Sequence, residues 1–343
     1  MKHEPIKKLF VILLAALLLV PLACGCAGEA TPTFDDCRAR PSNCGRLKVE
    51  GGKLCDENGE PVMLRGVSTN NMITCESFIN EQLFSELAEE GVNLIRLAMY
   101  TYGVGIVGYC TGGDKQRHLD DIDRGVEYAA ASDMYVIIDW HILSDGDPNT
   151  YIEEAKAFFA EVAEKYSTRD NVLYEICNEP NGVDWPAVKR YAEEIIPVIR
   201  EKDPSSVILV GSPDWSKDLA HAAADPLAFD NIMYTFHFYS ATHKANVRAA
   251  AVSAIDRGLP VFVTEFGITA VSGDQPRDID EADKWIEMLE SANVSWCMWS
   301  LSKVAEASAC IRATVPKYCG FEEVDYTPTG LWLLETLKKH TGQ

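Results

Sequence analysis

The chain has 343 residues, of which 47% are hydrophobic and 24% are charged. This composition is typical of one globular unit with a large core, and it excludes collagen-like and intrinsically disordered proteins. The formal net charge of −21 argues against a nucleic-acid partner, because phosphate binding needs clustered Lys and Arg. The same charge argues against electrostatic adhesion to anionic lipid, and it suits a protein that acts on a neutral ligand.

The N-terminal segment has the pattern of an export signal. Lysines precede an apolar run from Leu9 to Ala23, which is too short to span a membrane comfortably but suits a secretory signal. Cys24 and Cys26 follow small residues, as at a bacterial lipoprotein cleavage site. We expect residues 1–23 to be removed and residues 24–45 to form a flexible tether. The exported protein would then be anchored by a lipid on Cys24 or Cys26, with simple cleavage and release as the alternative.

The remaining sequence alternates short apolar runs with helical stretches. A small hairpin is expected first, with arms at 46–50 and 53–56. Strands are then expected near residues 62–67, 93–99, 134–140, 172–178, 206–211, 232–239, 260–266 and 294–300. Helices are expected near residues 79–91, 120–132, 150–166, 185–201, 215–224, 244–257, 278–291 and 329–340.

This alternation predicts an α/β fold. Continuous apolar strands separated by helices are typical of parallel strands that are buried on both faces. Eight such units predict a (β/α)₈ TIM barrel with a small N-terminal β-hairpin, forming one catalytic domain over residues 46–343. A doubly wound open sheet is the alternative, but the sequence has no G-x-G-x-x-G after the first strand.

The chain contains 11 cysteines. In an exported protein, loop cysteines are expected to form disulfides, and the candidate pairs are Cys75 with Cys110 and Cys310 with Cys319. Connectivity cannot be deduced from spacing alone. Two further cysteines, at 177 and 297, lie in apolar strands and are expected to be buried free thiols. The cysteine spacing fits no zinc motif, so no metal and no cofactor are expected.

Polar side chains gather at the carboxyl ends of the predicted strands, where barrel enzymes place their active sites. Alternation along a strand places Glu265 on one face with Val261 and Val263. Glu175 lies lower on its strand, and we expect it to pair with a buried arginine such as Arg65. The side chains expected to converge on the barrel mouth are Arg96, His141, Glu179, His237, Tyr239, Glu265 and Trp299.

Two glutamates that face each other across a barrel mouth suit glycoside hydrolysis. That reaction needs one protonated and one ionised carboxyl group. Arg96 would hold Glu265 ionised, and the Tyr239 hydroxyl would orient it. Glu179 would then feel a negative neighbour and retain its proton. Trp299 offers an apolar face for a sugar ring, with core packing as its alternative role.

Seven stretches of the sequence carry a family resemblance. They are NLIRLAMY (93–100), VIIDWHILSDGDPN (136–149), YEICNEPNG (174–182), GSPDWS (211–216), FHFYSATH (236–243), VFVTEFG (261–267) and WCMWSLS (296–302). In this order they resemble glycoside hydrolase family 5, and within it the bacterial endoglucanases of subfamily 2. The resemblance covers the chain from about Arg46 to His340.

The resemblance implies a retaining double displacement, with Glu179 as the acid/base and Glu265 as the nucleophile. It implies that Asn178 contacts the 2-hydroxyl group of the substrate. The residues that it places around the −1 sugar are Arg96, His141, His237 and Tyr239. The sugar platforms that it implies are Tyr100, Trp299 and Trp215.

Two positions depart from the family pattern. Relatives carry a histidine where this chain has Asn70 and a tryptophan where it has Thr74. Asn70 can still donate a hydrogen bond to a sugar, but we expect weaker binding in the distant negative subsites. Lys303 follows Trp299 by four residues, one fewer than in relatives. Lys303 is nevertheless expected among the sugar ligands, at a position shifted by one residue.

These inferences predict a monomeric endo-β-1,4-glucanase that acts on cellulose or soluble β-glucan. Mannan, xyloglucan and mixed-linkage glucan are alternative substrates, and a transglycosylase would use the same residues. A non-catalytic glycan-binding barrel is the alternative from another class. It is disfavoured because a binding protein has no need of a paired acid and nucleophile.

Overall fold

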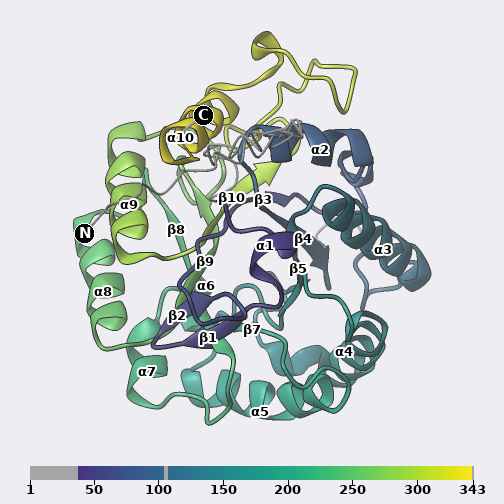
Figure 1. Ribbon diagram of the computed structural model, residues 1–343, viewed down its shortest axis with the longest axis vertical. Coiled ribbons are helices and arrows are strands. Elements are labelled where there is room, and N and C mark those ends of the chain that lie inside the picture. The colour runs from purple at the N-terminus through teal and green to yellow at the C-terminus, as the bar shows by residue number, and fades with distance from the viewer. Residues whose placement is uncertain (1–37, 104–106, 342–343) are drawn as a thin grey trace, which may run out of the picture.

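Eight parallel strands close into a barrel in the computed structural model, which describes residues 38–103 and 107–341 (Figure 1). The strands, in order, are β3 (Arg65–Thr69), β4 (Leu94–Tyr100), β5 (Tyr135–His141), β6 (Val172–Glu175), β7 (Ile208–Val210), β8 (Ile232–Tyr239), β9 (Val261–Gly267) and β10 (Trp296–Leu301). Each strand pairs in parallel with the next, and β10 pairs with β3 to close the ring. The predicted (β/α)₈ barrel is confirmed.

Helices surround the barrel and connect successive strands (Figure 1). They are α2 (Glu81–Glu89), α3 (Lys115–Ala131), α4 (Ile152–Tyr166), α5 (Trp185–Lys202), α6 (Pro213–Ser216), α7 (Leu219–Ala224), α8 (Ala245–Asp256), α9 (Ile279–Ala292) and α10 (Pro328–Thr341). Short 3₁₀ helices lie at Glu76–Phe78, Pro148–Tyr151 and Glu323–Asp325. Side chains of Asn80, Asp114 and Asp184 accept hydrogen bonds from the first turns of α2, α3 and α5, which fixes where these helices begin.

The helix expected at 215–224 is interrupted. Asp214, Trp215 and Ser216 all have left-handed backbone angles, with φ of 58°, 57° and 55°. L-residues rarely adopt this conformation in succession, and here it makes up most of α6, so the regular helix begins only with α7 at Leu219. The turn carries Trp215 out of the helical layer, where its side chain is 47% exposed.

A short helix and a hairpin cover the amino-terminal end of the barrel. They are α1 (Pro41–Cys44), β1 (Lys48–Glu50) and β2 (Lys53–Cys55), and they lie over the barrel centre in Figure 1. Leu47 and Leu54 join Leu64 in a hydrophobic cluster with inward-facing residues of the strands. This end of the barrel is therefore closed by apolar packing, and the hairpin forms as predicted but with shorter arms.

The predicted tether was wrong for residues 38–45, which belong to the fold. Arg38 and Ala39 are buried, and the Asn93 side chain donates a hydrogen bond to the Ala39 carbonyl at 3.0 Å. Residues 1–37, including Cys24 and Cys26, lie outside the described residues, so the signal, the remaining tether, export and lipid attachment stay predictions. Within the described residues, no helix combines the length and apolarity needed to cross a membrane.

Strand β9 contains a bulge that sequence alternation did not predict. Thr235 pairs with Phe262 and His237 pairs with Glu265, so β9 has one more residue than β8 between these positions. Phe262 faces the barrel interior, whereas Val261 and Val263 pack in the outer layer. The expectation that Glu265 shares a face with the two valines was therefore wrong. A bulge lets consecutive residues point to the same side of a sheet.

The disulfide predictions were also wrong. Cys75, Cys110, Cys310 and Cys319 are free thiols, as are the other described cysteines, including Cys177 and Cys297 as expected. Burial raises the pKa of the Cys110 and Cys310 thiols to about 12. Disulfide formation requires a thiolate, which these environments disfavour.

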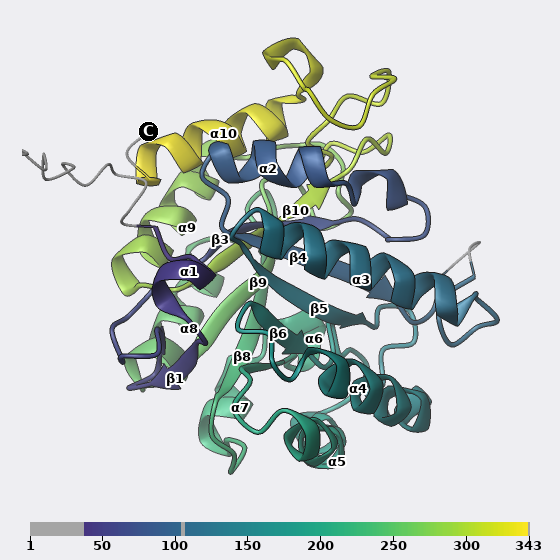
Figure 2. The ribbon, with the colours of Figure 1, turned by 45° about the vertical axis from the view of Figure 1, so that its right-hand side comes forward.

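The long connection from β10 to α10 packs against α2 (Figure 2). The Asn80 side chain donates a hydrogen bond to the Tyr318 carbonyl at 3.1 Å, and the Gly320 amide donates to Glu86 Oε2 at 2.7 Å. These contacts hold one end of a loop whose other end borders the carboxyl end of the barrel.

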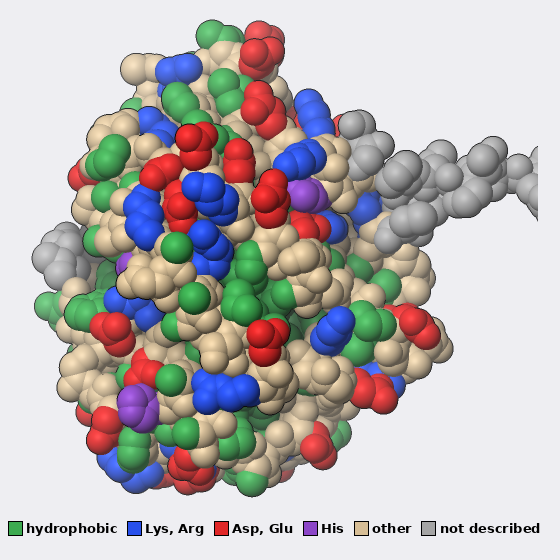
Figure 3. Space-filling model, turned by 90° about the vertical axis from the view of Figure 1, so that its left-hand side faces the viewer, with side chains coloured by type: hydrophobic (Ala, Val, Ile, Leu, Met, Phe, Trp, Pro, Cys, Tyr) green, Lys and Arg blue, Asp and Glu red, His purple; other side chains and the backbone are tan. Residues whose placement is uncertain are grey.

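Charges of both signs are interspersed on the face formed by α8 and α9 (Figure 3). Lys244 pairs there with Asp278, and Arg248 pairs with Glu281. These two cations are thus matched with acids.

Candidate active site

A cavity of about 560 Å³ lies at the carboxyl ends of the strands. The sequence-predicted residues that line it are Asn70, Tyr100, His141, Glu179, Trp215, His237, Tyr239, Glu265 and Trp299. Further lining residues are Leu143, Lys217, Thr242, His243, Val271, Ser272, Gly273 and Glu306. The structure thus brings together, in one hollow, side chains that come from most of the barrel.

Beneath the cavity, Arg96 of β4 is fully buried among three acids. Its Nε lies 2.7 Å from Glu175 Oε2, its Nη2 lies 2.9 Å from Asp139 Oδ2, and its Nη1 lies 3.2 Å from Glu265 Oε2. Burial alone would lower the pKa of Arg96, but the three acids raise it well above its ordinary value. One cation therefore organises carboxylates from three other strands.

The expected pairing of Glu175 with Arg65 was wrong. Glu175 accepts hydrogen bonds from Arg96, whereas Arg65 pairs with Glu290 of α9 at 2.6 Å. Arg65 stands at the first position of β3, near the amino-terminal end of the barrel, while Glu175 ends β6. Strand alternation tells which face a residue is on, but it does not tell that Arg65 and Glu175 lie at different heights along the barrel axis.

Glu265 of β9 has a partner for each carboxylate oxygen. The Tyr239 hydroxyl donates to Oε1 at 2.7 Å, and Arg96 donates to Oε2 at 3.2 Å. Its side chain is nevertheless 6% exposed toward the cavity. A carboxylate held in this way is oriented and charge-compensated, as the sequence predicted from Arg96 and Tyr239.

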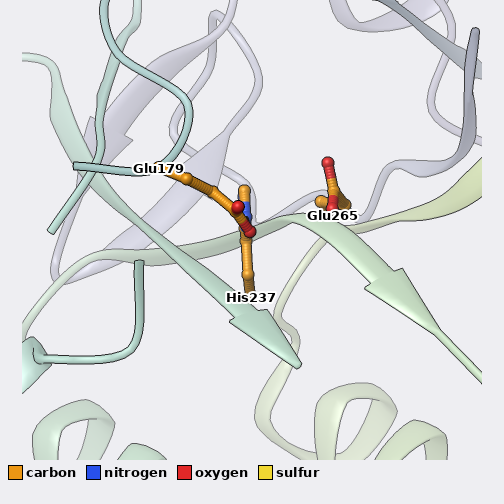
Figure 4. Close-up of side chains that lie close together, drawn as sticks. All are labelled: Glu179, His237 and Glu265. Atoms are coloured by element: carbon orange, nitrogen blue, oxygen red, sulfur yellow. The ribbon is translucent and has the colours of Figure 1, made fainter. Parts of the chain in front are cut away.

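Glu179 follows β6 and approaches His237 of β8 (Figure 4). Its Oε1 lies 3.0 Å from His237 Nδ1. Burial raises the pKa of Glu179 to about 8, and Arg96 opposes this shift. The proton is therefore retained mainly because of burial, and not chiefly because of the charge of Glu265 as expected from the sequence.

The two glutamates lie close together across the cavity. One oxygen of Glu179, one oxygen of Glu265 and a ring nitrogen of His237 all lie within 4.8 Å of one another. Such a triad has the spacing of metal ligands, but Glu265 is already bonded by Arg96 and Tyr239. A guanidinium at this position disfavours an additional divalent cation by repulsion.

Aromatic rings form one wall of the cavity. The rings of Tyr100 and His141 stack with centroids 4.1 Å apart, and His141 stacks on Trp299 with centroids 5.5 Å apart. The exposed indole of Trp215 lies at another part of the lining. Flat apolar faces of this kind suit the C–H faces of sugar rings.

The chain matches the family described as Cellulase (glycosyl hydrolase family 5) over residues 55–304. It is 46% identical over 300 residues to Endoglucanase A of Butyrivibrio fibrisolvens, covering 86% of this chain and 69% of that protein. It is 41% identical over 334 residues to an endoglucanase of Clostridium saccharobutylicum, covering 96% and 72%.

The chain belongs to glycosyl hydrolase family 5. The fold agrees, since the catalytic domain of a Thermobifida fusca endoglucanase in complex with cellotetraose superposes with a TM-score of 0.83 at 38% identity. That alignment covers 88% of this chain and 100% of the other. The protein is therefore a glycoside hydrolase, as the sequence predicted.

Three predicted sugar ligands do not line the cavity. Arg96 and Asn178 are fully buried beneath it, and Asn178 Oδ1 accepts a hydrogen bond from Arg96 Nη2 at 2.6 Å. The placement of Lys303 at the cavity was wrong. Its ammonium lies 3.6 Å from the Tyr318 ring centroid and donates to the Val315 carbonyl at 3.0 Å, so cation–π attraction and this hydrogen bond hold it elsewhere.

Sequence reasoning missed several ionisable residues of the family 5 site, including His243 at the cavity lining. Lys217 and Glu306 line the cavity, and Asp139 contacts both Arg96 and His141. Asp139 shared the inward face of its predicted strand with His141, so alternation could have found it. Lys217 and Glu306 stand in irregular loops, where no periodic pattern reports the direction of a side chain.

We predict that Glu179→Gln changes the pH dependence of stability. Below pH about 4.5 Glu179 is neutral in both folded and unfolded chains, so it contributes no pH dependence there. As the pH rises to about 8 the unfolded chain ionises while the folded chain retains the proton, so the wild type loses stability. The variant should therefore be more stable than wild type by a few kcal/mol at pH 9 and similar at pH 4, measured by urea unfolding.

Glu290→Gln is a matched control with the opposite sign. Although burial opposes it, Arg65 lowers the pKa of Glu290. Its ionised form therefore stabilises the fold above the unfolded pKa, and this contribution is lost as the pH falls. If the free energy of unfolding differed between Glu179→Gln and wild type by the same amount at pH 4 and at pH 9, burial would not be the cause of the raised pKa of Glu179.

Proposed function

We propose that this protein is a retaining endo-β-1,4-glucanase that cleaves internal bonds of cellulose or soluble β-glucan. The observation that carries this proposal is the pair of buried glutamates whose oxygens approach within 4.8 Å. Carboxyl groups of retaining enzymes are about 5–5.5 Å apart, whereas inverting enzymes leave about 6.5–9.5 Å for a water molecule.

In the first step, Glu265 attacks the anomeric carbon from one side of the sugar. The bond between that carbon and the leaving oxygen breaks, and the electron pair stays with the oxygen. Glu179 donates its proton to this oxygen, for which the raised pKa of about 8 keeps it protonated at neutral pH. A glycosyl ester on Glu265 results.

In the second step, water replaces the departed sugar. Glu179, now a carboxylate, accepts a proton from the water while the oxygen of that water attacks the anomeric carbon. The ester bond breaks, and the carboxylate of Glu265 regains its hydrogen bonds from Arg96 and Tyr239. Two inversions leave the anomeric configuration unchanged.

The relatives and the cavity lining support this substrate class. Two relatives that cover most of this chain are named as endoglucanases, and a solved family member holds cellotetraose. The tryptophan and tyrosine rings at the cavity favour a flat, equatorially linked chain. Mannan, xyloglucan and mixed-linkage glucan share such backbones, so a panel of these polysaccharides scored for reducing ends decides among them.

We predict a retained anomer and distinct phenotypes for the two glutamates. Proton NMR of the first-formed product should show the β-anomer. Glu265→Gln should abolish turnover of all substrates, because a neutral amide does not displace the leaving group. Glu179→Ala should lose activity on polysaccharide but still be glycosylated by aryl cellobiosides with good leaving groups, which need no proton.

Glu290→Gln serves here as the control for loss of a partly buried acid, because its partner Arg65 lies at the far end of the barrel. It should retain activity. A first-formed α-anomer, or full polysaccharide activity in Glu265→Gln, would contradict the proposed mechanism.

We also predict that binding is concentrated at and beyond the cleavage point. Thr74 is exposed and lies outside the cavity lining, so position 74 supplies no ring for the distant negative end. Trp215 should support sugars on the leaving-group side, and Trp215→Ala should lower kcat/KM for cellopentaose by roughly 5- to 150-fold, as expected for loss of about 1–3 kcal/mol of ring stacking.

Thr74→Trp should lower KM for long oligosaccharides and leave cellotriose unchanged, while Thr168→Trp controls for an added exposed indole elsewhere. Kinetics that are insensitive to both Thr74→Trp and Trp215→Ala would contradict this assignment of the two ends.

A further inference from the structure

A chain of buried hydrogen bonds runs from the proposed acid Glu179 to the Arg96 cluster. His237 Nδ1 lies 3.0 Å from Glu179 Oε1, and His237 Nε2 lies 2.9 Å from Thr264 Oγ1. The Thr264 hydroxyl in turn lies 2.7 Å from Glu175 Oε1. All four side chains are buried.

The direction of each hydrogen bond in this series follows from Glu175, the residue at the end farthest from Glu179. Glu175 accepts hydrogen bonds from Arg96 through both oxygens, at 2.7 and 3.3 Å. Burial raises the pKa of Glu175, but the Arg96 guanidinium opposes this and favours the carboxylate, which has no proton to donate. The single proton of the Thr264 hydroxyl must therefore point to Glu175. The Thr264 oxygen is then free only to accept, and His237 Nε2 must carry the proton that it accepts.

The same reasoning fixes the direction of the hydrogen bond between His237 and Glu179. Burial lowers the pKa of His237 to about 4, so the ring is neutral near pH 7 and carries one proton. With that proton on Nε2, Nδ1 is a bare acceptor. A carboxylate of Glu179 would face it lone pair against lone pair, whereas a protonated Glu179 donates to it.

We propose that Thr264 and Glu175 are positioning residues that fix His237 in the Nε2–H tautomer, so that Nδ1 holds the proton of Glu179 until substrate arrives. This inference rests on the proposed function for its catalytic consequence, but the tautomer itself does not. The bulge in β9 is what makes it possible, because it turns Thr264 as well as Glu265 into the barrel.

In the reaction, the leaving oxygen of the sugar takes the proton from Glu179. The O–H bond of Glu179 breaks and an O–H bond of the leaving group forms, while the electron pair of the glycosidic bond moves to that oxygen. When water is later deprotonated, the proton returns to Glu179 and restores the hydrogen bond to Nδ1. His237 gains and loses no proton overall.

Other charged groups around Glu179 also influence its pKa, in addition to the contact with His237. Burial is the main cause of its raised pKa. The charged groups that face it are Arg96 from β4, Asp139 from β5, Glu175 from β6, Lys217 after α6 and Glu265 from β9. Thr264→Val removes none of these charged groups, but it also removes the hydrogen bond that Glu175 accepts, so the tautomer is measured directly as well.

The first test is the tautomer of His237, read from ¹⁵N–¹H correlation spectra of the imidazole groups in the whole protein at pH 7. His237→Asn assigns the signal. We expect a protonated Nε2 and a bare Nδ1 in wild type and in Thr264→Ser, which keeps the hydroxyl. In Thr264→Val, the population of His237 rings should shift toward the tautomer that carries its proton on Nδ1. A wild-type ring protonated on Nδ1 would overturn the proposal whether or not the enzyme is active.

The second test is the pH profile of kcat/KM. Without the hydroxyl, His237 can turn its proton toward Glu179 and stabilise the carboxylate. The basic limb of the kcat/KM profile for cellopentaose should therefore move to lower pH by about one unit in Thr264→Val. In Thr264→Ser it should stay at its wild-type position. Hydrolysis of an aryl cellobioside with a good leaving group should not show this shift in the glycosylation step, because it needs no acid.

Thr235→Val is the matched control, because this buried threonine on neighbouring β8 bonds to Ser216 and not to His237. Its basic limb should stay in place. If Thr264→Val keeps the wild-type tautomer and the wild-type limb, or if Thr235→Val moves the limb equally, the positioning role is wrong. An inactive wild type with the expected tautomer would instead refute the proposed function and leave the hydrogen-bond assignment intact.

Discussion

The active face depends on one guanidinium, which is completely buried at the centre of the barrel. Arg96 of β4 binds acids from β5, β6 and β9, and it also donates to Asn178. Desolvating this cation is costly, and breaking such a buried cluster by removing one partner typically costs about 3–5 kcal/mol. The cluster therefore stabilises the barrel only because all its members are present, and it fixes the two glutamates relative to each other.

The same interior gives the two glutamates different environments. Glu265 takes hydrogen bonds from Arg96 and Tyr239, whereas Glu179 faces a histidine and keeps its proton through burial. Two identical carboxyl groups thereby differ, since one is bonded by a cation and a hydroxyl while burial keeps the other neutral. This division opposes folding stability at alkaline pH, because burying Glu179 is favourable only while it is neutral. Such costs are common at catalytic sites.

Sequence periodicity was sufficient for the barrel and for most of the site. Continuous apolar strands between helices have few alternative folds, and Glu179, His237 and Glu265 follow or end such strands, so their convergence could be predicted. The departures arise where backbone irregularity or tertiary contacts decide. No pattern announces the bulge that turns Thr264 inward, or the left-handed turn that exposes Trp215. The position of Lys303 depends on a ring 15 residues away, and the end of the tether depends on Asn93 capturing the Ala39 carbonyl.

The central claim is that the Arg96 cluster presents Glu265 as the attacking carboxylate. Its most direct test is to incubate the wild-type protein with a 2-fluoro-cellobioside that carries a good leaving group, and to locate the label by peptide mass spectrometry. The fluorine slows both steps, while the leaving group keeps the first step fast enough for the glycosyl ester to accumulate. The account predicts one cellobiosyl group attached to Glu265. A label on any other residue, or turnover without a covalent intermediate, would contradict it.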